Sequence, residues 1–206
     1  MEMKYFYTEP FPFFIMENFF TDSEESLIWK ELEFLNSNKK LLGPEKTSSA
    51  ELENGLFGKQ NRGIFLDDVY STRSLSNILE VNRKIFNINI LQELSKLDYC
   101  FQGIVDCNQD HTLLSYYEHG GKYLPHRDSA CFTILYWFYK EPKKFMGGEL
   151  LFSDHNIKIE IANNKMILFP SSFTHEVSEV FMDDSAGEGD GRYCISQFLT
   201  INPNKR

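Results

Sequence analysis

The sequence predicts an α+β protein whose core is a jelly roll, in which two antiparallel sheets face each other. Three observations favour this class. Apolar residues recur at helical spacing in the first 98 residues, whereas the chain from residue 99 onward consists of short apolar or alternating runs separated by Gly, Pro, Asn or Asp. The 206 residues also include 19 Phe and 10 Tyr, which suit sheets. This length fits one domain, so we expect residues 1–206 to form a single unit with helical support in 1–98 and the jelly-roll core in 99–206.

The first half of the chain carries two apolar stripes. Thr21 and Glu24 form a predicted capping box, after which a helix should begin. Its stripe is Leu27, Ile28, Leu32 and Leu35, and the second stripe is Leu75, Ile78, Leu79, Ile85 and Phe86. Residues 90–97 either extend the second helix or begin another. The polar stretch 36–53 predicts a surface loop, followed by a strand-like run at 63–66.

The second half of the chain predicts about eight strands. They span approximately 99–105, 112–117, 131–139, 149–152, 157–161, 165–169, 176–180 and 193–201.

Charge and cysteine usage exclude several classes of protein. A formal charge of -9 would repel a phosphate backbone, so nucleic acid is an unlikely partner. The four cysteines, Cys100, Cys107, Cys131 and Cys194, form neither a CxxC pair nor a disulfide framework, which favours a reducing, cytoplasmic setting. The N-terminal stretch lacks the pattern of a signal peptide, and no run approaches the roughly 20 apolar residues of a membrane span, so we expect no membrane partner.

His126 and Asp128 form a candidate metal clip. On an extended chain, residues two apart project from the same face, so both side chains can reach one ion while Arg127 points away. His175, after an apolar strand and a short turn, can complete a triad of two His and one carboxylate, which suits Fe(II) and leaves adjacent positions open. His155 is the only rival as third ligand. A zinc hydrolase could use the same side chains with a bound water.

Arg192 begins the predicted strand that follows the one with His175, so both side chains can face one pocket. A guanidinium stays charged and binds a carboxylate through two hydrogen bonds. A dicarboxylate that chelates the metal through one end would require such a partner for the carboxylate at its other end. A zinc hydrolase would have no need of this arginine.

A family resemblance covers about residues 112–201. The segment resembles the catalytic core of the prolyl 4-hydroxylase branch of the Fe(II)/2-oxoglutarate dioxygenases. The motifs that carry the likeness, in family order, are Tyr117-Glu118-His119-Gly120, Tyr123-Leu124-Pro125-His126-Arg127-Asp128, Gly147-Gly148-Glu149-Leu150-Leu151-Phe152, Leu168-Phe169-Pro170 through His175-Glu176-Val177, and Arg192-Tyr193.

The resemblance implies a double-stranded β-helix core with supporting N-terminal helices. It implies Fe(II) held by His126, Asp128 and His175, with 2-oxoglutarate and O2 as cosubstrates and room for ascorbate as a further cofactor. The far carboxylate of 2-oxoglutarate would pair with Arg192, which completes the catalytic set. Hydroxyls of Tyr117 or Ser196 would assist, and Trp137, with Tyr136 beside it, stands where the family often has a Tyr.

The implied activity is hydroxylation of an unactivated C–H bond, with release of succinate and CO2. Asp128 favours hydroxylation over halogenation, because the related halogenases replace this carboxylate with a small residue. The substrate is expected to be a prolyl or other residue of a protein or peptide, and the loop 41–59 to be a lid over it. Two alternatives stay open: a free amino acid or small metabolite as the substrate, and a jelly-roll binding module with a vestigial metal site.

Overall fold

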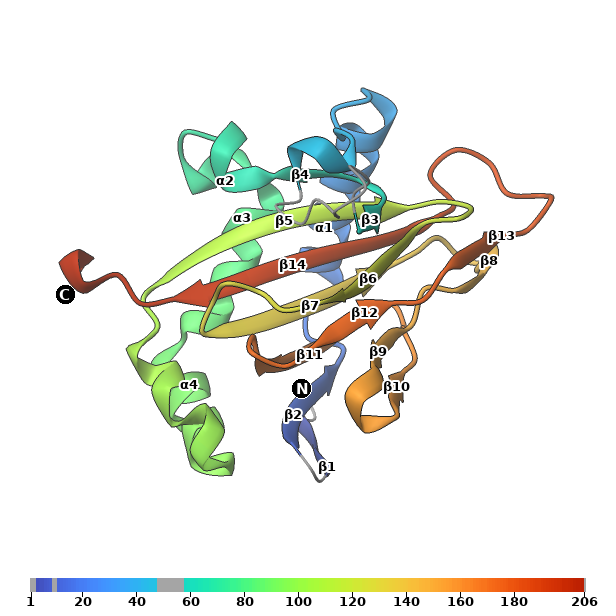
Figure 1. Ribbon diagram of the computed structural model, residues 1–206. Coiled ribbons are helices and arrows are strands. Elements are labelled where there is room, and N and C mark those ends of the chain that lie inside the picture. The colour runs from blue at the N-terminus through green and yellow to red at the C-terminus, as the bar shows by residue number, and fades with distance from the viewer. Residues whose placement is uncertain (1–2, 9–10, 48–57, 206) are drawn as a thin grey trace.

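The computed structural model describes residues 3–8, 11–47 and 58–205, and it confirms the α+β class with a double-stranded β-helix core. Two antiparallel sheets carry the core (Figure 1). The larger has the order β1 (Met3–Thr8), β2 (Phe11–Glu17), β11 (Lys165–Pro170), β7 (Phe132–Phe138), β14 (Arg192–Thr200), β5 (Gln109–Tyr117) and β4 (Arg62–Phe65). The smaller has the order β10 (Ile157–Ile159), β9 (Leu150–Phe152), β12 (His175–Val177), β6 (Lys122–His126) and β3 (Lys59–Gln60). A separate ribbon pairs β8 (Phe145–Gly147) with β13 (Val180–Met182).

The α-helices pack on the outer face of the larger sheet, away from the smaller one (Figure 1). The α-helices are α1 (Asp22–Ser37), α2 (Leu66–Val69), α3 (Asn77–Asn82) and α4 (Ile88–Leu97). Short 3-10 helices are η1 (Pro44–Lys46), η2 (Arg73–Leu75), η3 (Arg83–Phe86), η4 (Tyr99–Asp106), η5 (Ser153–His155) and η6 (Pro203–Lys205).

The predicted capping box at the start of α1 is confirmed. Glu24 N donates to Thr21 Oγ1, and Thr21 N donates to Glu24 Oε2 at 2.8 Å. Three of the four stripe residues are buried, but Leu27 is 38% exposed, because the stripe facing the sheet is centred on Ile28 and Leu32. The residues of the second stripe are divided among η2, α3 and η3, and α4 is a separate helix. The first residue of this stripe, Leu75, is exposed.

The predicted strand at 99–105 is wrong, because this segment is the 3-10 helix η4. The side chain of Asp98 accepts a hydrogen bond from Cys100 N at 2.9 Å, which caps a helical turn. Phe101 and Ile104, three residues apart, are both buried, so the apolar residues follow a helical rather than an alternating pattern. The predicted strand at 176–180 divides into β12 and β13.

The strand pairings of the larger sheet do not follow the expected division at residue 98 into helical support and jelly-roll core. β2 pairs with β11, and β4 pairs with β5, so residues before 98 supply strands to the larger sheet as well as helices. The sequence predicted no strand at β2, whose pairing with the larger sheet is made by β11, a strand that begins only at Lys165. Only a long-range pairing makes such a segment a strand.

The larger sheet is buried on both faces, which explains the continuous apolar run of β7. All seven residues of β7 are buried. Ile134 and Tyr136 pack with the helices, whereas Leu135 and Trp137 face the interior between the sheets. The same alternation on β5 and β14 sends every second side chain into the space between the sheets, which is where a site can form.

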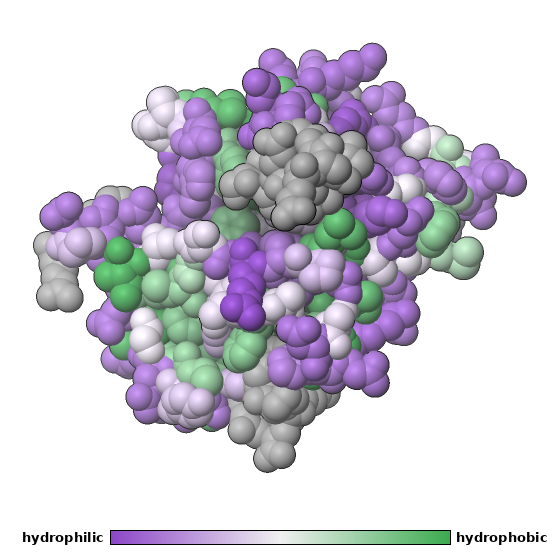
Figure 2. All heavy atoms as spheres, viewed as in Figure 1, coloured by the Kyte–Doolittle hydropathy of each residue, from purple (hydrophilic) through white to green (hydrophobic). Residues whose placement is uncertain are grey.

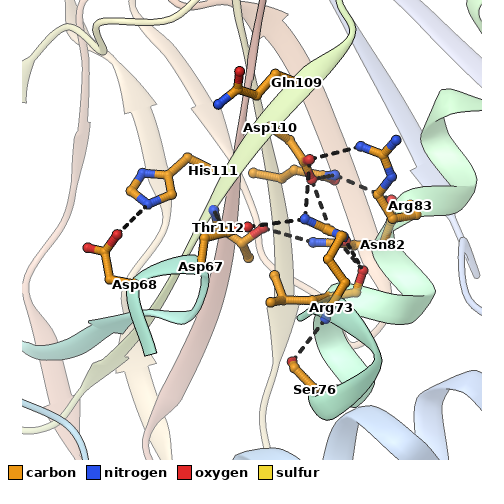
Figure 3. A network of polar contacts seen from close by, with 12 residues as sticks. Asp67, Asp68, Arg73, Ser76, Asn82, Arg83, Gln109, Asp110, His111 and Thr112 are labelled. Atoms are coloured by element: carbon orange, nitrogen blue, oxygen red, sulfur yellow. Dashed lines mark hydrogen bonds and ion pairs between the residues drawn. The ribbon is translucent and has the colours of Figure 1, made fainter. Parts of the chain in front are cut away.

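A buried polar network fastens the helical layer to the larger sheet (Figure 3). Asp110, on β5, accepts hydrogen bonds from Arg73, Arg83 and Gln197 at 2.8 to 3.3 Å. Arg73 also donates to Asn82 at 2.6 Å, and the charges are therefore paired and hydrogen-bonded. This network holds η2 and α3 at the end of β5.

The surface on the side shown in Figure 2 is mostly hydrophilic, with small, scattered hydrophobic groups. Among the helices of the described residues, none is long and apolar enough to cross a membrane.

Candidate active site

The three predicted metal-binding side chains meet between the two sheets. His126 ends β6, His175 begins β12, and the two residues are direct partners in the antiparallel pairing. Asp128 follows β6 by two residues, with Oδ1 3.8 Å from His126 Nε2 and Oδ2 3.4 Å from His175 Nε2. The ligand atoms all lie within 4.8 Å of one another. In the described part of the chain this is the one such group, and the predicted rival His155 lies outside it, in η5.

The orientation of both imidazoles suits a metal ion. Nδ1 of His126 lies 2.9 Å from Leu124 O, and Nδ1 of His175 lies 3.0 Å from Phe173 O. A carbonyl oxygen only accepts, so each Nδ1 carries the proton and each Nε2 keeps a lone pair directed at the centre of the triad. Burial, assisted by neighbouring His175, lowers the pKa of His126 to about 3, which keeps this ring neutral.

Asp128 is held in place by a pair of buried hydroxyls. Thr133 Oγ1 donates to Asp128 Oδ2 at 2.6 Å and lies 2.8 Å from Ser171 Oγ. The backbone N of Asp128 donates to Ser171 O at 3.1 Å. Sequence reasoning missed Thr133 and Ser171. The sequence contained one indication for Thr133: it lies on the same face of its predicted strand as Leu135 and Trp137.

Arg192 is the most unusual charged residue of the site. It begins β14, is 0% exposed, and lies with its guanidinium carbon 4.8 Å from the ring centre of Tyr117. None of its three nitrogens has a hydrogen-bonding partner within the described residues. A buried cation without a partner is costly, so the site is built to receive an anion. The planar guanidinium matches a carboxylate, as a dicarboxylate cosubstrate requires.

The Gly-Gly-Glu motif makes room for this arginine. Gly148 has φ of +75°, and a Cβ at this position would lie 2.7 Å from Arg192 Cδ. Only glycine provides both the backbone conformation and the space. The motif therefore shapes the anion site although it contributes no ligand.

Two of the other predicted contact residues, Tyr117 and Ser196, face the cavity. Burial raises the pKa of Tyr117 while Arg192 opposes the rise, so its hydroxyl keeps a proton to donate. Between the two aromatic candidates on β7, Trp137 points into the interior between the sheets, whereas Tyr136 packs with the helices and donates to Gln197 at 2.8 Å. The indole N–H of Trp137 has no partner among the described residues.

A cavity of about 520 Å³ contains the triad and Arg192. This volume is typical of a small-molecule site. Its wall follows alternate residues of β14 and β5, and near its far end the rings of Phe65 and His111 stack at 4.6 Å. His111 lies within β5, and its Nε2 lies 3.2 Å from Asp68 Oδ1 (Figure 3). Lys59, Lys46 and Arg127 also line the cavity, and sequence reasoning singled out neither lysine.

Comparisons with known proteins agree with this arrangement. Residues 112–200 match the family model described as the 2OG-Fe(II) oxygenase superfamily. No curated protein sequence matches the chain. Among solved structures, a prolyl-4-hydroxylase from Pseudomonas putida is similar with a TM-score of 0.64 at 13% identity, covering 94% of each chain.

Two further prolyl hydroxylases share the fold. One, from Trichoplax adhaerens, is in complex with a hypoxia inducible factor oxygen degradation domain peptide fragment; it has a TM-score of 0.60 at 14% identity, covering 91% of this chain and 83% of that one. The other is the viral collagen prolyl hydroxylase of Paramecium Bursaria Chlorella virus-1, in a 2-oxoglutarate complex, with a TM-score of 0.55 at 14% identity, covering 91% and 94%. At these identities the likeness shows the shared fold.

The family match and the donor set of the triad lead to one conclusion about the protein's class. Residues 112–200 match the 2OG-Fe(II) oxygenase superfamily, and the protein is a dioxygenase that uses Fe(II), 2-oxoglutarate and O2.

Proposed function

We propose that this dioxygenase hydroxylates an unactivated C–H bond of a prolyl or other residue in a protein or peptide, and converts 2-oxoglutarate to succinate and CO2. The observation that carries the proposal is the buried guanidinium of Arg192, without a partner among the described residues, in the same cavity as the triad. The fold shared with three prolyl hydroxylases, one of them bound to a peptide, supports the substrate class.

In this proposal His126, Asp128 and His175 hold Fe(II), which when bound supplies the redox chemistry with O2. Asp128 occupies the third ligand position, which favours hydroxylation over halogenation. Its carboxylate is oriented by Thr133, whose hydroxyl donates to Oδ2 at 2.6 Å. Both histidines are kept in the ligand tautomer by backbone carbonyls.

Four residues are proposed to bind the cosubstrate. Arg192 pairs with the far carboxylate, and the protonated hydroxyl of Tyr117 donates to the same group. Ser196, which faces the cavity four residues after Arg192 on β14, contributes a hydroxyl. The buried indole N–H of Trp137, which lacks a partner among the described residues, is the fourth donor. The surrounding apolar interior excludes water from these contacts.

The loop 41–59 is proposed to close over the peptide. Residues 44–46 form η1, and Glu45, Lys46 and Thr47 line the cavity, whereas 48–57 lie outside the described residues. Substrate should protect this loop from proteolysis. Equal cleavage with and without substrate would count against a lid.

The first test is an anaerobic titration of the protein with Fe(II) and then 2-oxoglutarate, followed through the visible charge-transfer band of the chelate. We expect a band in the wild type, none in His175→Ala, and a much higher requirement for 2-oxoglutarate in Arg192→Ala. His155→Ala is a control that should behave as the wild type, because His155 lies outside the triad. Absence of a band in the wild type would favour a zinc enzyme or a binding module.

The substrate class needs a second measurement. Succinate formation should be stimulated by proline-containing peptides more than by free amino acids. Stimulation by free amino acids alone would favour the small-metabolite alternative.

A further inference from the structure

A second buried cation lies on the cavity wall, on the sheet opposite Arg192. Lys59 belongs to β3, at the edge of the smaller sheet, and is 1% exposed. Its ammonium donates to two oxygens of Thr47, the carbonyl at 3.0 Å and Oγ1 at 3.2 Å. Both acceptors are neutral, so one of the three donors and the whole positive charge stay available to a ligand.

Lys59 has no carboxylate within ion-pair distance among the described residues, which is uncommon for a fully buried lysine. Burial lowers its pKa to about 8, and the charge of Asp128 opposes this fall. The ammonium form therefore still predominates at neutral pH. Together with Arg192, it gives the cavity two buried positive charges that lack an anionic partner in the described part of the chain.

The position of Lys59 places this charge beside the metal triad. Its Nζ lies 5.5 Å from the ring centre of Tyr123, and the same ring stacks on His126 at 3.6 Å with 15° between the planes. Lys59 and Arg192 both act on Cys194, where their charges oppose the rise in pKa that burial causes. Both cations thus border the chamber that contains the triad.

We propose that Lys59 is a second carboxylate-binding position of this cavity, separate from Arg192. The proposal rests on the dioxygenase function proposed above, and it deepens that function by assigning the cavity a second acidic group to recognise. The carboxylate has two sources in such a site: the far end of the 2-oxo acid, shared with Arg192, or an acid group on the primary substrate. The chemistry at Lys59 is the same in both, a charge-assisted hydrogen bond in a buried setting.

The experiment compares 2-oxoglutarate with 2-oxopentanoate, which has the same chain but no far carboxylate. Both are titrated anaerobically into the Fe(II) form of the wild type and of Lys59→Met, with the chelate band as the readout. If the far carboxylate is the ligand, the variant should bind 2-oxoglutarate about tenfold or more weakly and 2-oxopentanoate unchanged. Because the two ligands are compared in one variant, a general loss of folding would weaken both.

A second experiment tests whether the carboxylate bound by Lys59 belongs to the primary substrate. Acetate and benzoate, as the simplest aliphatic and aromatic carboxylates, are titrated calorimetrically into the Fe(II) and 2-oxoglutarate complex. A carboxylate on the primary substrate predicts binding in the wild type that Lys59→Met weakens about tenfold, with 2-oxoglutarate binding unchanged.

Two control variants distinguish carboxylate binding by Lys59 from a purely structural role of this residue. Lys40→Met removes an exposed lysine that does not line the cavity, so the binding of the 2-oxo acids and of the simple carboxylates should stay unchanged. Thr47→Val removes one acceptor of Lys59 but no charge, so it should not reproduce the loss. If Lys59→Met changes the result of neither experiment, or weakens both 2-oxo acids equally, Lys59 only supports residues 44–47 and the inference is overturned. A wild type without a chelate band would instead overturn the dioxygenase function itself.

Discussion

The hydroxyl of Thr133 donates a 2.6 Å hydrogen bond to Oδ2 of Asp128, and this is the same oxygen that lies 3.4 Å from Nε2 of His175. Thr133 is 0% exposed and belongs to β7 of the larger sheet, whereas the two histidines belong to the smaller one. The contact therefore ties the carboxylate of the proposed metal site to the larger sheet, across the space between the sheets.

Removal of this hydroxyl should weaken metal binding. Thr133→Val keeps the shape of the side chain but leaves Asp128 without its orienting donor, so we expect about 10- to 100-fold lower affinity for Fe(II). Calorimetric titration with Fe(II) under anaerobic conditions measures this affinity. Thr112→Val is the matched control, because Thr112 is equally buried and accepts a hydrogen bond from Asn82, at a distance from the triad. Equal losses in both variants would contradict a specific role for Thr133.

Substitution of Gly148 should impair the anion site. Gly148→Ala forces a Cβ to within 2.7 Å of Arg192 Cδ and also strains the backbone at φ of +75°. We expect weaker 2-oxoglutarate binding together with a loss of stability. Gly120→Ala isolates the backbone contribution, since Gly120 has φ of +78° and nothing within 4 Å of the added Cβ. It should cost about 1–2 kcal/mol of stability and leave 2-oxoglutarate affinity unchanged.

Glu149 should make stability fall in acid. Burial raises the pKa of this carboxyl, but hydrogen bonds from Lys158 and Ser178 outweigh it and lower the pKa from 4.5 to about 2. A folded pKa below the unfolded one means that the contribution is complete above pH 4.5 and is lost as the pH falls towards 2. Urea unfolding from pH 6 to 3 should show a steeper fall in the wild type than in Glu149→Gln. Parallel curves would show that Glu149 adds nothing to the acid sensitivity.

The polar network beneath the site should be needed for stability rather than for ligand binding. Asp110→Asn removes the charge that Arg73 and Arg83 share, at a carboxylate that is only 3% exposed (Figure 3). We expect a loss of about 3 kcal/mol in the free energy of unfolding, measured in urea, with 2-oxoglutarate binding retained in the folded fraction. Glu93→Gln, which breaks the exposed pair with Lys96, should cost about 0–1 kcal/mol. A loss of that size in Asp110→Asn would mean that the network is dispensable.

The sequence by itself determined the parts of this protein that depend on neighbours along the chain. The capping box of Thr21 and Glu24, the two-residue spacing of His126 and Asp128, and the strand that begins at Arg192 are local patterns whose geometry follows from helix and strand periodicity. The order of motifs from Tyr117 to Arg192 was sufficient to name the family that the match over residues 112–200 then supported.

The tertiary structure alone decided which residues from distant segments meet. Lys59 reaches the cavity because β3 pairs with β6, Thr133 reaches Asp128 across the two sheets, and Trp137 rather than Tyr136 faces the interior because of the register of β7 against β14. A shift of one residue in that register would exchange the two faces of the strand. Such contacts join residues far apart in the chain, and their geometry is set by packing and strand register, which no local pattern contains.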